Sequence, residues 1–305
     1  MPVRLFLAAL IALALAGPAS AAPLPGASRC PVLPRDNAFN QRVDALAVAP
    51  DSARIVASIG LQEGLHADFG SGTYEGRPIG IPFDVVAKRT RRSRVRFEYA
   101  GESDRVGYPI PRGVHIEGGP GADGDRHALL VDRDACRLYE LYALEREGSH
   151  PPRWHAGSGA TWHLNSNRSR PRGWTSADAA GLPILPGLAR YDEVRRGHID
   201  HALRFTVQRT RNAFVFPARH FASSLSDPAL PRMGERLRLK AGVDISRLPR
   251  QARIVAQALK TYGMLVADNG SDWYISGAPS PGWDNDALRS LGGLRGTDFE
   301  VVRAG

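Results

Sequence analysis

The sequence predicts a mainly β protein, a β-sandwich or jelly roll with one long helix near the C-terminus and short helical turns elsewhere. Three observations favour this class. Many short segments alternate apolar with polar residues, the chain contains 32 glycines and 23 prolines, and only one segment has the period and end signals of a long helix. The hydrophobic fraction of 43% is sufficient for a full core.

The first 21 residues have the pattern of a secretory signal peptide. Arg4 supplies the positive charge, Leu5–Ala16 the apolar stretch and Ala19–Ala21 the small residues of a cleavage site. We therefore expect a secreted or periplasmic protein. No later apolar run is long enough to span a membrane. Because no linker-like tract divides residues 22–305, we expect one β-rich domain. We also expect a monomer.

The two cysteines, Cys30 and Cys136, are expected to form a disulfide, as a pair of cysteines usually does in an exported protein. The bond would close a loop of roughly 100 residues and tie the mature N-terminus to a strand over Arg137–Leu144. The alternative, two free catalytic thiols, lacks an accompanying Cys-His signature.

Strands are expected where apolar and polar residues alternate with a period of two. The segments with this pattern are residues 94–99, 137–144 and 236–245. Two further strands are expected at residues 127–132, a compact apolar run, and at residues 213–216, a short aromatic run that Pro217 ends. Near the C-terminus, Met264–Asp268 and Ser271–Ser276 flank Asn269-Gly270, which is a strong signal for a β-hairpin.

One long helix is expected after residue 246. Ser246 or a neighbour would cap it, Pro249 suits its first turn and Gly263 would end it. Its apolar stripe would consist of Ile254, Ala258, Leu259 and Tyr262.

Residues 174–207 combine acids, histidines and dense turn signals in one unit. Ser176 is a suitable N-cap for a helical turn that includes Asp178. A second short helix is expected from Leu188 to Arg195, ended by Gly197. A strand would follow from Ile199.

Three residues of this unit have two interpretations each. His201 falls on the apolar face of the expected strand, so it is either a core histidine bonded to a backbone carbonyl or a site histidine facing a cleft. Asp178 is either a helix-start acid or a catalytic acid, and in the second case Asp178→Asn would cost little stability. Glu193 is either a solvated helix acid paired with an arginine or a catalytic acid.

The formal net charge is +9, and residues 88–96 are especially rich in arginine. This balance favours a polyanionic partner such as an acidic polysaccharide or an anionic cell wall. The alternative is that the arginines follow the composition of the source genome. Alternation also puts Arg236, Arg238 and Lys240 on one face of a strand, opposite an apolar face.

Several sequence motifs of nucleotide-binding, hydrolase and metal sites are absent or lack the structural context that they require. Gly119–Gly124 matches G-x-G-x-x-G, but a strand follows it instead of a helix. The chain has no P-loop and no G-x-S-x-G elbow. His198, Asp200 and His201 have metal-like spacing, but on a strand they would face opposite sides. We therefore expect no metal and no cofactor, and the lack of a nucleic-acid-binding motif excludes a sequence-specific nucleic-acid partner.

The strings GDRHALLVDRDACRLYELY, WTSADAAGLPILPGLARYDEV, HIDHALRFTV and ALKTYGMLVADNGSDWYISG resemble those of a family of exported, mostly uncharacterised bacterial proteins. The resemblance covers nearly all of the mature chain. It implies export but no catalytic residues. Some members carry a nucleotide-binding label, which the missing P-loop does not support here.

Two classes of function fit these features. The first is an exported carbohydrate-active enzyme, a glycoside hydrolase or polysaccharide lyase, whose polysaccharide substrate would be acidic if the basic charge is functional. The alternative is a non-catalytic glycan- or cell-wall-binding protein. Acids and tryptophans near the C-terminus suit sugar binding, since indole rings stack on pyranose faces and carboxylates hold hydroxyls. These residues are Asp268, Asp272, Trp273, Trp283 and Asp284.

The candidate site residues follow from these chemistries. A hydrolase needs two carboxylates, and Asp178 with Glu193 or Glu140 is the expected pair. A lyase would neutralise a uronate and abstract a proton, using residues among His127, Tyr191, His201, Arg204 and Lys240. The expected substrate-binding residues are Arg126, Trp174, Tyr191, Arg204, Arg219, Lys240 and Trp273.

Overall fold

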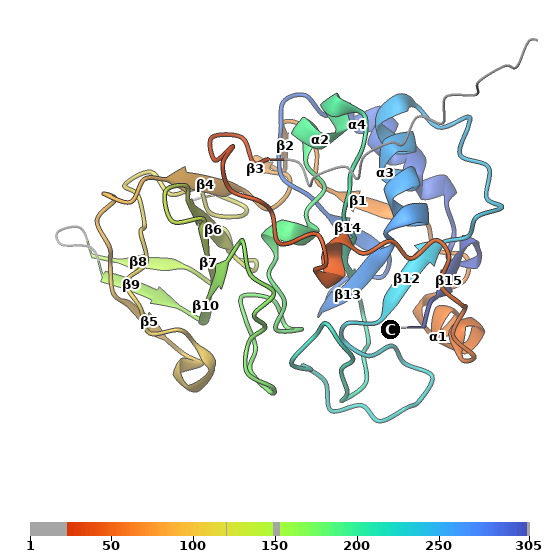
Figure 1. Ribbon diagram of the computed structural model, residues 1–305, viewed down its shortest axis with the longest axis horizontal. Helices are drawn as coiled ribbons and strands as arrows, with labels where there is room; N and C mark the ends of the chain where they lie inside the picture. The colour runs from red at the N-terminus through yellow and green to blue at the C-terminus, as the bar shows by residue number, and fades with distance from the viewer. Residues whose placement is uncertain (1–22, 120, 149–152, 304–305) are drawn as a thin grey trace, which may run out of the picture.

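The computed structural model describes residues 23–119, 121–148 and 153–303, and its strands form two main groups (Figure 1). The signal peptide predicted for residues 1–21 lies outside the described residues. Within the described ranges, no helix is both long enough and apolar enough to cross a membrane.

The first group is a six-stranded sheet in the order β1-β14-β11-β13-β12-β15. Its strands are β1 (His66–Asp68), β11 (Leu203–Val207), β12 (Arg236–Leu239), β13 (Met264–Asn269), β14 (Tyr274–Ser276) and β15 (Phe299–Val301). The β1–β14 and β11–β13 pairs are parallel, whereas the other three pairs are antiparallel. The sheet is therefore mixed.

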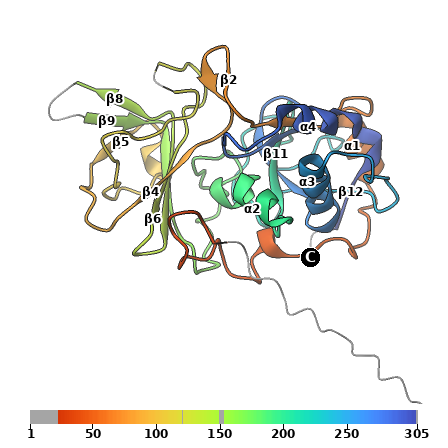
Figure 2. The same ribbon diagram turned by 90° about the horizontal axis from the view of Figure 1, so that it is seen from above.

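The α-helices gather around this sheet (Figures 1 and 2). They are α1 (Ser52–Ile59), α2 (Tyr191–Arg196), α3 (Arg250–Thr261) and α4 (Asn285–Arg289). α3 begins directly after Pro249, and Gly263, with a φ of +69°, lies just beyond its last turn. Its buried side chains, including Val255 and Leu259, join the apolar core of the six-stranded sheet.

The second group contains a four-stranded sheet in the order β10-β7-β6-β4, a three-stranded sheet in the order β5-β9-β8 and a small hairpin. The strands are β2 (Thr73–Tyr74), β3 (Arg77–Pro78), β4 (Phe83–Val86), β5 (Val95–Phe97), β6 (Ala128–Asp132), β7 (Arg137–Tyr142), β8 (Glu145–Glu147), β9 (Arg153–Ala156) and β10 (Ser158–His163). Short 3₁₀ turns connect several elements: Ala38–Asn40, Ala100–Glu102, Leu185–Gly187, Ser290–Gly293 and Gly296–Asp298.

The four-stranded sheet has an apolar core on each face, because successive side chains of a strand point to opposite sides. Leu129 and Leu138 belong to one core and Leu130 to the other. His127 and Glu140 have the parity of the first face. They therefore project toward the chain that runs between the two groups of strands, drawn in green in Figure 1.

The predicted mainly β class is confirmed, since strands outnumber helices in the described chain and form several sheets. The more specific sandwich or jelly roll is not confirmed, because the largest sheet mixes parallel with antiparallel pairs and has helices packed around it.

The hairpin predicted at Asn269-Gly270 is wrong. β13 and β14 belong to the same sheet, but β11 lies between them and pairs with both. The connection is shaped by Trp273, which is fully buried at a φ of +61° and packs against Phe205 and Phe299 at ring distances of 6.2 and 4.9 Å. Burial of a large aromatic side chain outweighs the local turn preference here.

The expected row of exposed cations on β12 also differs from the structure. The strand ends at Leu239. Arg236 is buried and donates from Nη2 to the carbonyl of Ala38, and burial lowers its pKa to about 10. Arg238 is paired with Glu300. The cations are therefore used within the fold and do not form a free face for a polyanion.

The predicted disulfide between Cys30 and Cys136 is confirmed, with a Cα–Cα distance of 5.2 Å and a sequence separation of 106 residues. Cys136 lies directly before β7, so the bond ties the first described residues to the four-stranded sheet.

Removing this crosslink should destabilise the protein. We expect replacement of both cysteines by serine to lower the free energy of unfolding by about 2–5 kcal/mol, because the unfolded chain gains conformational freedom. Chemical denaturation of the variant and of the wild type measures this difference. Thiol titration of the denatured, unreduced wild type should find no free thiol, and two free thiols would contradict the pairing.

Candidate active site

The segment Ser176–Ala189 joins the two groups of strands. From the four-stranded sheet, Ser158 Oγ donates to the Ser176 carbonyl at 2.5 Å, and His127 Nε2 lies 3.0 Å from the Ala177 carbonyl. Toward the six-stranded sheet, two backbone amides of the segment donate to carbonyls of β13 and β14. These bonds are Ala180 N to Ala267 O at 2.9 Å and Ala189 N to Ser276 O at 3.1 Å.

Glu140 anchors the same segment from β7. Its carboxylate accepts hydrogen bonds from the backbone N–H groups of Ile184 and Leu185, at 2.9 to 3.0 Å. The side chain is fully buried. Burial, assisted by the charge of Asp178, raises the pKa of Glu140 to about 7 against the opposing effect of the two amide hydrogen bonds. Its position suits an anchor of the fold more than a residue that contacts substrate.

Asp178 lies at the centre of the segment and binds Arg204 of β11. Arg204 Nε donates to Asp178 Oδ2 and Nη2 donates to Oδ1, both at 2.9 Å. Arg204 Nη1 donates to Ser276 Oγ at 2.7 Å. The guanidinium also reaches Asp268 at the end of β13, with Nη2 at 3.2 Å from Oδ2. Two carboxylates therefore share one guanidinium.

The two carboxylates differ in accessibility. The Asp178 side chain is 0% exposed, whereas that of Asp268 is 22% exposed. Burial and the negative charge of Asp178 together raise the pKa of Asp268 to about 7, against the opposing effect of Arg204. Asp268 can therefore hold a proton near neutral pH and exchange it with a ligand.

Asp268 and Asp178 line an open cavity of about 520 Å³ between the two groups of strands. This volume lies within the range of small-molecule sites, about 300–1,000 Å³. The cavity is lined by Tyr99, Glu102, Asp125, Tyr142, Ser158, Thr175, Ser176, Ala177, Asp178, Ala179, His220, Ala222, Asp268 and Asn269. We call it the acidic cavity.

Glu102 and His220 face each other in the acidic cavity. Glu102 Oε2 accepts a hydrogen bond from Thr175 N at 2.8 Å and lies 3.9 Å from His220 Nε2. His220 Nδ1 lies 2.8 Å from the Ala179 carbonyl, to which it donates, so that Nε2 points to Glu102.

His127 lies beneath the cavity and is paired with Glu117. Its Nδ1 is 2.6 Å from Glu117 Oε2, and its Nε2 faces the Ala177 carbonyl. Both partners are acceptors, so both ring nitrogens must carry protons. Burial lowers the pKa of His127, but the charge and hydrogen bond of Glu117 outweigh it and raise the pKa to about 9. His127 thus holds the Ala177 carbonyl and does not line the cavity.

The predicted residues Glu193 and His201 form a separate cluster at α2. Glu193 is buried, with Oε1 at 2.6 Å from Arg190 Nη2 and Oε2 at 3.2 Å from His201 Nε2. His201 Nδ1 also contacts the Ala202 carbonyl at 2.9 Å. The core interpretation of His201 therefore fits its environment, and neither side chain lines the acidic cavity. Glu193 is a buried partner and not a solvated helix acid.

The remaining predicted sugar-binding side chains also lie outside the acidic cavity. Trp273 is fully buried and donates from Nε1 to the Gly60 carbonyl, so its ring is not free to stack on a sugar. Tyr191 packs against Trp283 at a ring distance of 5.6 Å. Lys240 Nζ donates to the carbonyl of Thr297.

Three others are held by neighbouring chain segments. Arg126 donates to the carbonyls of Ala122 and Leu144. Trp174 lies under the guanidinium of Arg170. Arg219 Nε donates to the Arg170 carbonyl and lines a different cavity.

Sequence patterns pointed to Asp178, Arg204 and, among the C-terminal acids, Asp268. Asp125 and His220, which also line the cavity, stand out in the sequence as polar residues at the ends of strands or loops. No sequence pattern singles out Glu102 or Tyr99 as a site residue. These residues follow no motif and become neighbours only when the two groups of strands pack together.

No known protein-family model matches the chain, and no curated protein and no solved structure is significantly similar to it. Among the described residues, no three His, Cys, Asp or Glu side chains are grouped so that they could hold a metal ion.

The structure changes the expected result of substituting Asp178. Asp178→Asn leaves the buried guanidinium of Arg204 with Asp268 as its remaining carboxylate, so we expect the free energy of unfolding to fall by about 3 kcal/mol. Chemical denaturation measures this loss. Asp286→Asn is the matched control, since Asp286 is exposed on α4, and it should change stability little. Equal stability of the two variants would show that the Asp178–Arg204 pair is not a structural constraint.

Proposed function

We propose that the protein is an exported glycoside hydrolase that acts on a polysaccharide in the acidic cavity, with Asp268 as the general acid. The observation that carries the proposal is the pair of carboxylates on Arg204, of which one is buried and the other opens into the cavity. Export is supported by the signal-peptide pattern and by the disulfide.

The two carboxylates on Arg204 suit different roles. Both oxygens of Asp178 are bound by Arg204 and none of its side chain is exposed. Asp178 therefore positions the guanidinium and disfavours the charged form of Asp268. Asp268 is partly exposed and its pKa is about 7, which suits a group that must donate a proton to a glycosidic oxygen near neutral pH.

Hydrolysis also needs a base for the attacking water. Glu102 lies in the same cavity, and its carboxylate is oriented by the backbone N–H of Thr175. In the proposed reaction Asp268 protonates the leaving oxygen as the bond to the anomeric carbon breaks. Glu102 accepts a proton from the water whose oxygen forms the new bond to that carbon.

The charge of the cavity favours a neutral substrate. Its lining includes Glu102, Asp125, Asp178 and Asp268, whereas the cation nearest to them, Arg204, is already paired. A uronate carboxylate would be repelled there. The residues suggested for a lyase are dispersed, since Tyr191, His201 and Lys240 each contact other parts of the fold. The proposal therefore favours hydrolysis of a neutral polysaccharide over elimination from an acidic one.

Asp268→Asn tests the proposed general acid. We expect it to lower kcat by about 100-fold or more, because general acid catalysis typically contributes 10²–10⁴, and to change the melting temperature by no more than a few degrees. The assay is incubation with a panel of neutral and acidic polysaccharides. Release of reducing ends and absorbance of an unsaturated uronate are both recorded.

The same panel separates the alternatives. Reducing ends without unsaturated uronate support a hydrolase, whereas both signals together mean a lyase. If the wild type gives neither signal, the remaining alternative is a non-catalytic glycan-binding protein. Asp286→Asn, the exposed control, should have wild-type activity, and an equally active Asp268→Asn would refute the role of Asp268.

The raised pKa of Asp268 also predicts a pH dependence. A general acid must be protonated, so kcat should fall as the pH rises through about 7, the pKa of Asp268. A pH–rate profile of the wild type measures this limb. A profile that stays flat up to pH 9, or one that rises across this range, would contradict the assignment.

A further inference from the structure

A second, smaller cavity of about 130 Å³ shares a wall with the acidic cavity. Arg219 lines the smaller cavity, whereas the next residue, His220, lines the acidic one. Both of their backbone N–H groups donate to the Ala180 carbonyl, at 2.8 and 3.2 Å. Ala179 lines the acidic cavity, and Gly181 lines the smaller one. The two cavities are thus separated only by these two adjacent chain segments.

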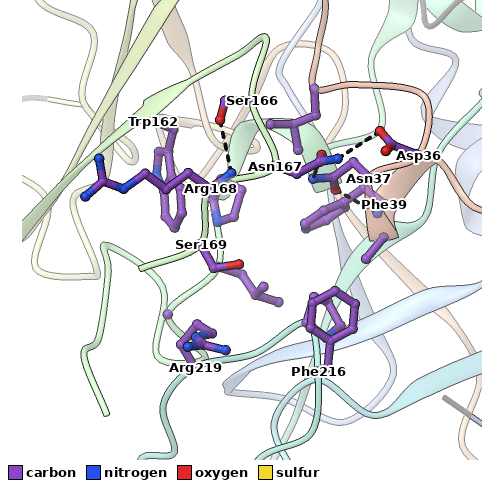
Figure 3. Close-up of a pocket in the computed structure, with 16 residues that line it drawn as sticks. Asp36, Asn37, Phe39, Trp162, Ser166, Asn167, Arg168, Ser169, Phe216 and Arg219 are labelled. Carbon is purple, nitrogen blue, oxygen red and sulfur yellow. Dashed lines mark hydrogen bonds between the residues drawn. The ribbon is translucent and has the colours of Figure 1, made fainter. Parts of the chain in front are cut away.

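Aromatic rings form much of the smaller cavity (Figure 3). Phe39 and Phe216 lie on one side of the opening, and Trp162 and Ser169 lie on the other. Phe39 and Trp162 are buried, but Phe216 is 54% exposed. An aromatic side chain that remains this accessible at a cavity is available to a ligand.

A chain of hydrogen bonds fixes the polar wall of the smaller cavity. Asn37 Nδ2 donates to Asn167 Oδ1 at 2.9 Å, and Asn167 Nδ2 donates to Asp36 Oδ1 at 2.8 Å (Figure 3). These bonds join two segments that are distant in the sequence. They hold the amides in one orientation before any ligand arrives, which lowers the entropic cost of binding.

Polar groups without partners also face this cavity. In the described chain, the Ser169 hydroxyl, Asp36 Oδ2 and the terminal nitrogens of Arg219 have no hydrogen-bond partner. A sugar-binding site combines hydrogen-bonding groups with aromatic side chains. The hydroxyls of the sugar form hydrogen bonds, and its C–H face packs on the aromatic rings. The volume of about 130 Å³ is slightly smaller than that of a cavity that holds benzene, about 150 Å³, so a sugar ring would be only partly enclosed.

Exposed aromatic side chains mark a route between the two cavities. The exposed aromatics of the described chain are Tyr74, Tyr99, Phe216 and Phe221. Tyr99 lines the acidic cavity and Phe216 the smaller one. Phe221 stacks on His220, in the wall between them, at a ring distance of 5.9 Å. Only Tyr74, on β2, lies apart from both cavities.

We propose that the smaller cavity binds one sugar ring of a neutral polysaccharide, whose chain continues past Phe221 to the acidic cavity. The catalytic part of this inference rests on the proposed hydrolase function, but binding in the smaller cavity does not. The substrate is then a polymer long enough to occupy both cavities.

Binding is tested without catalysis in the Asp268→Asn background, by affinity electrophoresis through gels that contain starch, mixed-linkage β-glucan, xylan or mannan. Phe216→Ala should weaken binding by about tenfold for the polysaccharide that retards the protein, since it removes one stacking ring. Tyr74→Ala is the matched control, an exposed aromatic away from both cavities, and it should leave binding unchanged. Asn167→Ala tests the polar wall and should also weaken binding.

A second measurement separates the subsite from a structural effect. With catalytically active protein, Phe216→Ala should raise KM for the polysaccharide and leave kcat/KM for an aryl glycoside of a single sugar unchanged. A short substrate occupies only the acidic cavity and does not reach Phe216.

The outcomes distinguish the two proposals. Equal retardation of the Phe216→Ala and Tyr74→Ala proteins, or no retardation by any of the four polysaccharides, would overturn the sugar subsite even if the enzyme is a hydrolase. Equal losses on polymer and aryl glycoside would also overturn it, because they indicate a disturbed fold. Weaker binding by Phe216→Ala together with no hydrolysis by the wild type would keep the subsite and reject the hydrolase.

Discussion

The ion pair between Asp178 and Arg204 is the interaction on which the arrangement of the two groups of strands depends. Asp178 belongs to the segment that also receives hydrogen bonds from Ser158 and His127, whereas Arg204 belongs to the six-stranded sheet. Both side chains are almost completely buried. A buried pair of charges is costly to break, because the partner left behind stays desolvated. The pair therefore fixes where the connecting segment crosses between the sheets.

The same pair creates the chemical asymmetry of the acidic cavity. Arg204 also contacts Asp268, which lies at the cavity wall. The negative charge of the nearby Asp178 raises the pKa of Asp268. The structural partner Asp178 and the proposed proton donor Asp268 thus share one guanidinium. The proposed role of Asp268 gives this polar cluster a use that apolar side chains, which would pack there at lower cost, could not serve.

The sequence predicts those features of the fold that depend on local patterns or on a specific chemical pairing. A compact apolar run predicts the strand around Leu129, and alternation predicts the strand around Leu138. Two cysteines in a chain with a signal-peptide pattern predict their bond. The sequence is less informative where tertiary packing determines the path of the chain. Asn269-Gly270 suggests a hairpin, but the burial of Trp273 sends the next strand to the other side of β11. Similarly, the sequence marks Asp178 as a candidate site residue, but only the fold shows that Arg204 and Asp268 form one cluster with it.

The most direct test of this account is the pKa of Asp268, measured from the ¹³C chemical shift of its carboxyl carbon during a pH titration. Comparison with the Asp268→Asn protein assigns the signal. The structure predicts titration near pH 7, because the side chain is largely buried and lies beside Asp178. Titration near the usual value for aspartate, about 3.9, would contradict the claim that Asp268 is a general acid at neutral pH.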